Sequence, residues 1–289
     1  MSFQNFTVAL PFRKSRHDFI VSSRICSLAH HIFATFQYST TSPTPRELGF
    51  STRLWVWGAT QSIGEESDGL LVPADVNELV FDVSAGTDYT LFIFTDGSAA
   101  AAGNIERPEE YQGHFACGCQ NLSLGVNSII TIANVVNSNG DEVTAPKFRK
   151  VIAGVESFEG SGKMHSVFID EDGHVYAAGN NNRGQLCLGD DESRILPTRI
   201  DLPGDERAES AAVGGEFTLI LTSSGRVYGC GSNEFGQLGL GNGVIETDRP
   251  ERLDDLSSVR SISAGRDFSL ITASDGLYVM GDNTYGTLT

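Results

Sequence analysis

The run of residues that first suggests chemistry is Gly-Ser-Gly-Lys at 160–163. A glycine-rich loop ending in lysine can hold a nucleotide phosphate, because its backbone amides and the ammonium group surround the anion. Here Met164 stands where a phosphate loop has the Ser or Thr that binds magnesium, and Ser157 stands where its first glycine belongs. We therefore expect no nucleotide site at this run.

Two other groups of residues have the chemistry of ligands. Cys117 and Cys119, with His114 nearby, offer three metal ligands, but their spacing is tighter than in zinc sites and no second pair follows. The acidic runs 190–192 and 254–255 lack the alternating pattern of a calcium loop. We expect buried thiols in a degenerate strand and solvated turns, with metal binding, or partner binding at the acidic turns, as the alternatives.

No residue carries a recognisable catalytic pattern. His165 occupies a recurring position in the repeat described below, which favours a structural use over catalysis. No Ser or Cys shows a nucleophile elbow and no pair of carboxylates stands out. We therefore expect a protein that is not an enzyme, with no catalytic residue, no cofactor and no metal.

The cysteine content bears on the redox environment. The chain has five cysteines, an odd number at irregular spacing, and its 289 residues can bury a core without covalent cross-links. We therefore expect reduced cysteines in an intracellular compartment. The five positions are Cys26, Cys117, Cys119, Cys187 and Cys230.

The net charge of −17 is unevenly distributed. Residues 1–46 are basic, whereas residues 47–289 are strongly acidic. An acidic body repels phosphate backbones and has no basic face for counterion release, so we expect no direct binding of nucleic acid. A basic protein is the more natural partner, because opposite fields speed encounter. No apolar stretch is long enough to span a membrane as a helix.

Residues 1–49 form a basic extension rich in Arg, Ser and Thr. This composition is typical of a transit peptide, and 25–38 resembles mitochondrial presequences. The alternative is a disordered segment or an N-terminus that does not belong to the protein. The first interpretation predicts a mitochondrial location, and the second a cytoplasmic or nuclear one.

An internal repeat of about 51 residues organises the rest of the chain, 50–289. Four segments share a frame in which the first two glycines are eleven residues apart and a third follows after six, or five in the last copy. An aromatic residue or histidine stands three places after the first glycine of every copy. The four triplets are Gly86, Gly97 and Gly103; Gly162, Gly173 and Gly179; Gly214, Gly225 and Gly231; and Gly265, Gly276 and Gly281.

The spacing has a simple structural interpretation. Asp-Gly or Ser-Gly between two β-rich runs indicates a two-residue hairpin, since glycine accepts positive φ. Each unit is then a small antiparallel sheet that needs a neighbour to cover its second face. Residues 104–155 interrupt the period and hold an insertion or a degenerate unit, and 54–58 marks an earlier copy.

The second half of the unit carries the motif Gly-x-Asn-x-x-Gly-Gln-Leu, which recurs with one substitution in the last copy. Its further positions are Asn181, Gly184, Asn233, Gly236, Asn283 and Gly286. With the preceding Val-Tyr strand, this motif resembles the regulator of chromosome condensation repeat family. The resemblance is strongest over 160–289.

The resemblance implies an all-β propeller of four-stranded blades, with the recurring Gly and Asn residues at blade corners. The family's ring has seven blades, whereas residues 50–289 provide about five units. We therefore expect an incomplete propeller and favour truncation as the reason.

Two functions follow from the resemblance. The first is a scaffold that binds proteins through rim loops such as 104–155, 189–207 and 241–258, since loops on a rigid frame commonly carry recognition. The second is nucleotide exchange on a small GTPase, which the founding member of the family performs. No exchange residue can be carried over to this sequence, so the second rests on the fold alone.

Overall fold

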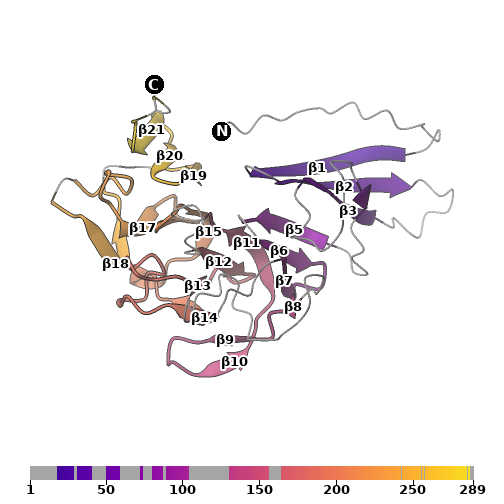
Figure 1. Ribbon diagram of the computed structural model, residues 1–289, viewed down its shortest axis with the longest axis horizontal. Helices are drawn as coiled ribbons and strands as arrows, with labels where there is room; N and C mark the ends of the chain where they lie inside the picture. Colours follow the sequence, from indigo (N-terminus) through magenta and orange to yellow (C-terminus); the bar gives the residue numbers. More distant parts are fainter. Residues whose placement is uncertain are drawn as a thin grey trace.

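The computed structural model shows a series of β-sheets that follow one another around an arc (Figure 1). It describes residues 80–86, 89–101, 131–155, 164–241, 243–254, 256, 258–284 and 286, together with the strand backbone at 18–28, 31–40, 50–58, 72–73, 102–103 and 130. Over these residues the structure contains strands, turns and one 3-10 turn, η2 (Pro203–Asp205). No helix in this part of the chain is long and apolar enough to cross a membrane.

The strands form five sheets, which we number as blades in chain order. Blade 1 contains β1 (Asp18–Leu28), β2 (His31–Thr40), β3 (Phe50–Gly58) and β4 (Val72–Pro73). Blade 2 contains β5 (Val80–Ala85), β6 (Tyr89–Phe94), β7 (Ala99–Gly103) and β8 (Ile130–Thr131). Blade 3 contains β11 (Phe148–Ala153), β12 (His165–Asp170), β13 (Val175–Gly179) and β14 (Arg194–Ile200).

Blade 3 is widened by two further strands, β9 (Asn134–Val136) and β10 (Glu142–Thr144). They form a hairpin that joins β14 in parallel at Thr198 and Val136. Blade 4 contains β15 (Ala208–Val213), β16 (Phe217–Thr222), β17 (Val227–Ser232) and β18 (Glu246–Arg252). Blade 5 contains β19 (Ser261–Ala264), β20 (Phe268–Thr272) and β21 (Leu277–Gly281).

The predicted all-β architecture of mostly four-stranded sheets is thus confirmed. Two strands of blade 1, β1 and β2, lie within the basic extension 1–49. The part of the insertion 104–155 that the structure describes supplies β8 to blade 2, the hairpin β9–β10 and then β11, the first strand of blade 3.

The hairpins correct one detail of the sequence interpretation. In blade 3 the amide of Asp170 donates to the carbonyl of His174 and the amide of Gly173 donates to Asp170, which encloses three turn residues rather than two. Gly173 has φ +83°, the left-handed conformation that ends a three-residue turn of this type. Only blade 5, among the described copies, has the shorter turn, where Ala273 donates to Gly276.

Alternation along each second strand covers both faces of a blade. In β12, Phe168 packs in a cluster with Leu91 of blade 2, whereas Val167 packs in a cluster with Ile220 of blade 4. In β16, Ile220 faces blade 3, while Leu219 packs toward blade 5. Because successive strand residues point to opposite faces, the three core clusters lie at the junctions between successive blades.

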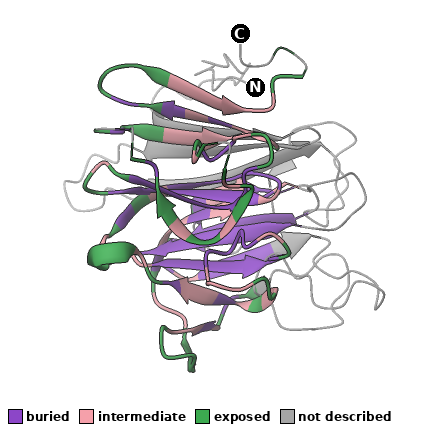
Figure 2. Cartoon of the chain, turned by 90° about the vertical axis from the view of Figure 1, so that its left-hand side faces the viewer, coloured by how far each residue is buried: buried purple, intermediate pink, exposed green. Residues whose placement is uncertain are grey.

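Burial falls toward the end of this series. Figure 2 shows buried residues concentrated in the strands of the middle blades and intermediate or exposed residues in the strands nearest the C-terminus. Phe217 and Leu219 of β16 are fully buried, whereas Phe268 and Leu270, at the equivalent positions of β20, are only partly buried. Their face is the one turned away from blade 4, since β20 presents Ile271 to that neighbour.

Candidate interaction site

The first glycine of each described repeat leaves space for a ring. A Cβ on Gly86 would lie 2.7 Å from Cδ1 of Tyr89, and Cβ atoms on Gly214 and Gly265 would contact Phe217 and Phe268 in the same way. Each of these glycine amides also donates to the carbonyl of the ring residue. This contact explains why an aromatic residue stands three places after the glycine. Gly162 and Lys163 of the Gly-Ser-Gly-Lys run lie outside the described residues.

The Asn and Gln of the motif organise the loop that follows the third strand. In blade 3 the Asn181 side chain accepts from the amide of Leu186 at 2.8 Å and donates to the carbonyl of Asp190 at 2.8 Å. The Gln185 side chain accepts from the amide of Arg183. In blade 4, Asn233 and Gln237 make the corresponding bonds to Leu238, Val244 and Phe235. These buried amides replace water around a folded loop.

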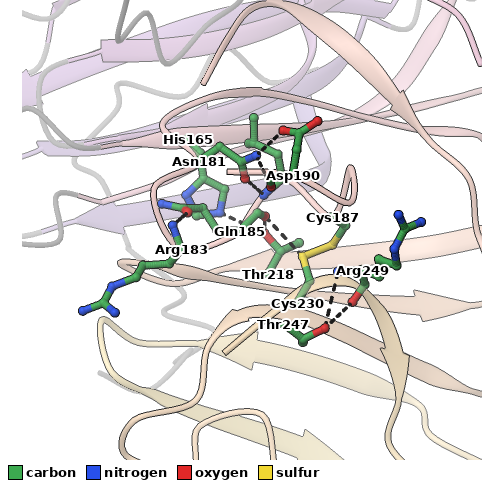
Figure 3. The surroundings of a disulfide bond; sticks show 11 residues. His165, Asn181, Arg183, Gln185, Cys187, Asp190, Thr218, Cys230, Thr247 and Arg249 are labelled. Atoms are coloured by element: carbon green, nitrogen blue, oxygen red, sulfur yellow. Dashed lines mark hydrogen bonds between the residues drawn. A yellow bond between two sulfur atoms is a disulfide. The ribbon is translucent and has the colours of Figure 1, made fainter. Parts of the chain in front are cut away.

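This loop also joins its blade to the next one (Figure 3). The Thr218 hydroxyl of blade 4 donates to the carbonyl of Gln185 at 2.7 Å, and the Ser269 hydroxyl of blade 5 donates to the carbonyl of Gln237 at 2.7 Å. A hydroxyl residue occupies this position, four after the first glycine, in all four copies. That recurrence was a readable signal for the junction, which the sequence interpretation missed.

His165 lies inside the junction between blades 3 and 4. Its ring Nε2 is 2.8 Å from Thr218 Oγ1, whose proton is committed to Gln185, so the ring donates to the hydroxyl oxygen. Complete burial lowers the pKa of His165 to about 3, with a small opposing effect of the Phe217 backbone. The side chain is therefore neutral at physiological pH and faces no solvent.

The expectation of unpaired cysteines is wrong for one pair. Cys187, after the motif of blade 3, and Cys230, in β17 of blade 4, form a disulfide with Cα atoms 5.5 Å apart. The two residues are 43 apart in sequence, and no spacing rule pairs them. Cys117, Cys119 and His114 lie outside the described residues. In the described part, no cluster of His, Cys, Asp or Glu is arranged to hold a metal ion.

A His–Asp pair lies beside a small cavity at the start of β13, at the other end of the strand from the motif. His174 Nδ1 is 2.9 Å from Asp170 Oδ2, and the other carboxylate oxygen caps the His174 amide. The cavity that His174, Arg199 and Arg207 help to line has a volume of about 80 Å³. Pockets for small-molecule substrates are several times larger. The carboxylate of Asp170 therefore serves the hairpin turn, as Thr222 Oγ1 does in blade 4.

Acidic side chains of blades 4 and 5 gather at the motif end around Arg183 of blade 3 and Arg266, and we call this group the acidic rim. Arg183 forms ion pairs with Glu216, Glu234 and Glu246 at 3.7, 2.8 and 3.1 Å. Asp267 pairs with Arg266 and is near Asp282. The rim comprises Glu216, Glu234, Glu246, Asp267 and Asp282, with Arg183 and Arg266 as its basic residues.

The electrostatics of the rim show an excess of negative charge. Desolvation raises the pKa of Asp267, Arg266 opposes this, and the neighbouring carboxylates of Asp282, Glu216 and Glu234 raise it further. Two cations thus face five carboxylates. The arrangement can accept an additional positive group from outside.

The acidic turns expected from the sequence are held by local contacts. Asp190 accepts from Arg194 at 2.6 Å and from the amide of Glu192, and these bonds outweigh desolvation and lower its pKa. Asp254 pairs with Arg252 at 3.2 Å. Neither turn contributes to the acidic rim.

Comparisons with known proteins agree with this geometry. Residues 172–221 and 224–272 match the family model of the Regulator of chromosome condensation (RCC1) repeat, and a second model with the same description matches 209–237 and 259–287. The chain is 27% identical over 246 residues to the ultraviolet-B receptor UVR8 of Arabidopsis thaliana, which covers 82% of this chain and 50% of the receptor. It is 34% identical over 134 residues to the X-linked retinitis pigmentosa GTPase regulator of Mus musculus, covering 44% of this chain and 13% of the regulator.

A solved structure extends the likeness to the whole fold. Prp20p of Saccharomyces cerevisiae, described together with its binding properties to Gsp1p and histones, matches with a TM-score of 0.65 at 16% identity. The match covers 91% of this chain and 58% of that chain. The chain thus spans half of the ultraviolet-B receptor, a smaller share of the GTPase regulator and somewhat more than half of Prp20p. These findings show RCC1-type repeats within residues 172–287 and confirm the propeller fold.

Proposed function

We propose that this chain, a propeller of RCC1-type repeats, is a non-enzymatic scaffold that binds a basic protein partner through its acidic rim. The observation that carries the proposal is a group of five carboxylates whose basic neighbours, among the residues that the structure describes, are Arg183 and Arg266. Opposite charge speeds encounter and sets the orientation of a complex more than it adds affinity.

Three features of the rim support this choice. Glu234 lies on a loop that the buried Asn233 side chain anchors, and Glu246 is the first residue of β18, so these carboxylates stand on a rigid frame. Their excess negative charge cannot be neutralised by Arg183, which already contacts three of them. Desolvation raises the pKa of Asp267 and the neighbouring carboxylates raise it further, although Arg266 opposes the rise, so an additional positive group is favoured there.

The test compares two triple variants with the same change in net charge. One replaces rim residues, Glu216→Gln, Glu234→Gln and Asp267→Asn. The other replaces exposed acids away from the rim, Asp141→Asn, Asp172→Asn and Glu209→Gln. Partners of the full chain are identified by crosslinking and mass spectrometry, and their association rates are then measured at several salt concentrations.

We expect the rim variant to associate at least ten times more slowly at low salt and to lose most of its salt dependence. The control variant should keep the association rate of the natural chain within a factor of about two, because its replaced charges lie away from the contact. Equal losses in both variants would contradict a role for the rim and would indicate an effect of net charge alone.

Regulation of a small GTPase is the second candidate. It is supported by the 34% identity over 134 residues to a protein named as a GTPase regulator. Nucleotide release from a panel of small GTPases, with and without the full chain, tests it directly. Acceleration of any member at catalytic amounts of the chain would support the candidate, and no acceleration across the panel would exclude it.

A mitochondrial location remains a proposal based on the composition of residues 1–49. Imaging a fluorescent fusion with and without residues 1–45 tests it. A change from mitochondria to cytosol on deletion would support a presequence, and an unchanged location would contradict it.

A further inference from the structure

We propose that Cys187 and Cys230 form a redox-dependent latch between blades 3 and 4. Cys187 lies in the loop that follows the motif of blade 3, and Cys230 lies in β17 of blade 4, so the disulfide links two separate sheets. Cys230 is fully buried and Cys187 is 4% exposed. The latch is a property of the fold itself, and it does not depend on the partner proposed above.

The next junction shows what the same two positions do without cysteine. Gly239 follows the motif of blade 4 as Cys187 follows that of blade 3, and Met280 occupies in β21 the place of Cys230 in β17. A Cβ on Gly239 would lie 2.5 Å from the Met280 sulfur. The two positions therefore meet at both junctions, and only the junction between blades 3 and 4 can become covalent.

The backbone at Cys187 is a second argument for the latch. Cys187 has φ 60° and Gly239 has φ +66°, so both positions are left-handed. This conformation suits glycine and costs another residue about 1 kcal/mol or more. A disulfide across the junction explains why cysteine stands at a position that favours glycine, because the stability gained from the cross-link offsets the cost of the left-handed backbone.

Neighbouring contacts determine how the bond can be reached. The loop that carries Cys187 is held to blade 4 by Thr218, which donates to Gln185, and by Gly189, whose amide donates to Asp248 at 2.8 Å. The Cys230 sulfur lies 3.4 Å from the Gln185 carbonyl (Figure 3). A reductant in solution therefore reaches the sulfurs only when the loop 180–193 opens.

The reaction is a thiol–disulfide exchange. Oxidation removes two electrons and two protons from the Cys187 and Cys230 thiols and forms the sulfur–sulfur bond. An external disulfide, glutathione disulfide or the disulfide of an oxidoreductase, accepts both electrons and protons and leaves as two thiols. A dithiol reverses the exchange by the same steps.

The first experiment counts the bond directly. The full chain is equilibrated with glutathione disulfide, denatured in the presence of an alkylating agent and digested. We expect a peptide pair joined through Cys187 and Cys230. Alkylated thiols at both positions would overturn the proposal, and this readout requires no variant to fold.

The second experiment measures the effect on stability. Closing a loop of this size predicts that reduction with dithiothreitol lowers the melting temperature by roughly 10 °C. The matched control is the double variant Cys187→Gly and Cys230→Met, which installs the residues of the next junction. It retains Cys26, Cys117 and Cys119, so it also controls for their reduction.

We expect the double variant to melt at the same temperature with and without dithiothreitol. Native oxidised chain should also react with dithiothreitol at least a hundred times more slowly than chain unfolded in urea, because the loop must open first. An equal shift in the natural chain and the double variant, or no shift in the natural chain, would show that the latch does not act on this junction.

Discussion

Two junctions can be compared, one between blades 3 and 4 and the other between blades 4 and 5. They share a hydrogen bond to a backbone carbonyl and differ in the side chains that surround it. In both, a hydroxyl group of the later blade donates to the carbonyl of the motif Gln in the earlier blade. At the first junction this hydroxyl also accepts from His165, and a disulfide lies beside it. At the second, the equivalents are Phe217, Gly239 and Met280.

The comparison separates the geometry of the repeat from its chemistry. The bond to the Gln carbonyl recurs at these two junctions, because in both the motif loop of the earlier blade packs on the later blade. The residues around that bond differ. The first junction has a histidine and a disulfide, whereas the second has Phe217, Gly239 and Met280. The first junction should therefore respond to protonation of a buried histidine and to thiol–disulfide exchange, whereas the core of the second junction contains neither group.

The largest expected effect comes from Gly231, at the end of β17. It has φ +98°, and an added Cβ would lie 2.7 Å from the Phe217 Cα and would collide with the Glu216 carbonyl. We expect Gly231→Ala to lower the free energy of unfolding by about 3–5 kcal/mol, since backbone strain and a backbone clash add. The control Gly241→Ala, with φ +82° and no neighbour within 4 Å, should cost only about 1 kcal/mol. Urea denaturation measures both, and equal losses would show that the close approach has no role.

The next effect comes from the two junction hydroxyls. Thr218→Val leaves both the Gln185 carbonyl and the His165 ring without a partner, so we expect a loss of about 3 kcal/mol in unfolding free energy. Ser269→Ala leaves only the Gln237 carbonyl unpaired and should cost about 1.5 kcal/mol. Denaturation at pH 7 compares the two. A larger loss at Ser269 would contradict the extra role assigned to Thr218.

The pH response should distinguish the two junctions through His165. The unfolded chain protonates this imidazole near its ordinary pKa of 6.5, whereas the folded chain holds the pKa at about 3. The contribution of neutral His165 to the unfolding free energy is therefore fully present above pH 6.5, and it is lost as the pH falls toward 3. Relative to His165→Phe, which copies the second junction, the natural chain should lose about 1.4 kcal/mol per pH unit, or about 2 kcal/mol by pH 5.

Unfolding free energies of both proteins at pH 7, 6 and 5 give this difference. Because the other titratable groups are shared, their contributions largely cancel. Parallel curves for the two proteins would show that His165 is protonated in the folded chain or is not buried.

The smallest expected effect on stability comes from Arg183 on the acidic rim. Its ion pairs are partly exposed, so Arg183→Gln should change the unfolding free energy by less than about 1 kcal/mol. The same change makes the rim more acidic, and the association rate of a basic partner should rise at low salt. A slower association would place Arg183 in direct contact with an acidic group of the partner.

Much of the fold was available from the sequence. The glycine frame, the hairpin signal and the motif predicted small sheets that need a neighbour on the second face, because each of these features is local or periodic. The turn length was predicted wrongly. Asp-Gly suggests a two-residue loop, but Gly173 is the third residue of its turn, and only the pairing of Ile169 with Val175 determines that length.

The site was less accessible to sequence reasoning. The Thr and Ser four places after the first glycine could have been noticed as a recurring hydroxyl, yet nothing local tells that its acceptor is a Gln carbonyl of the previous blade. The acidic rim combines side chains of three blades, so no single segment appears unusual. Arg183 and Glu246, for example, are brought together from different sheets.

The sequence by itself determined the repeat, its family resemblance and the strands that face a neighbour, because period and turn chemistry act within one unit. Only the tertiary structure decided the partners across junctions, including Cys187 with Cys230 and His165 with Thr218. Those pairs depend on how one blade docks on the next, and docking brings together residues separated by a full repeat. The motif identifies the positions that the two junctions share. It does not identify the histidine and the disulfide that only the first of these two junctions contains.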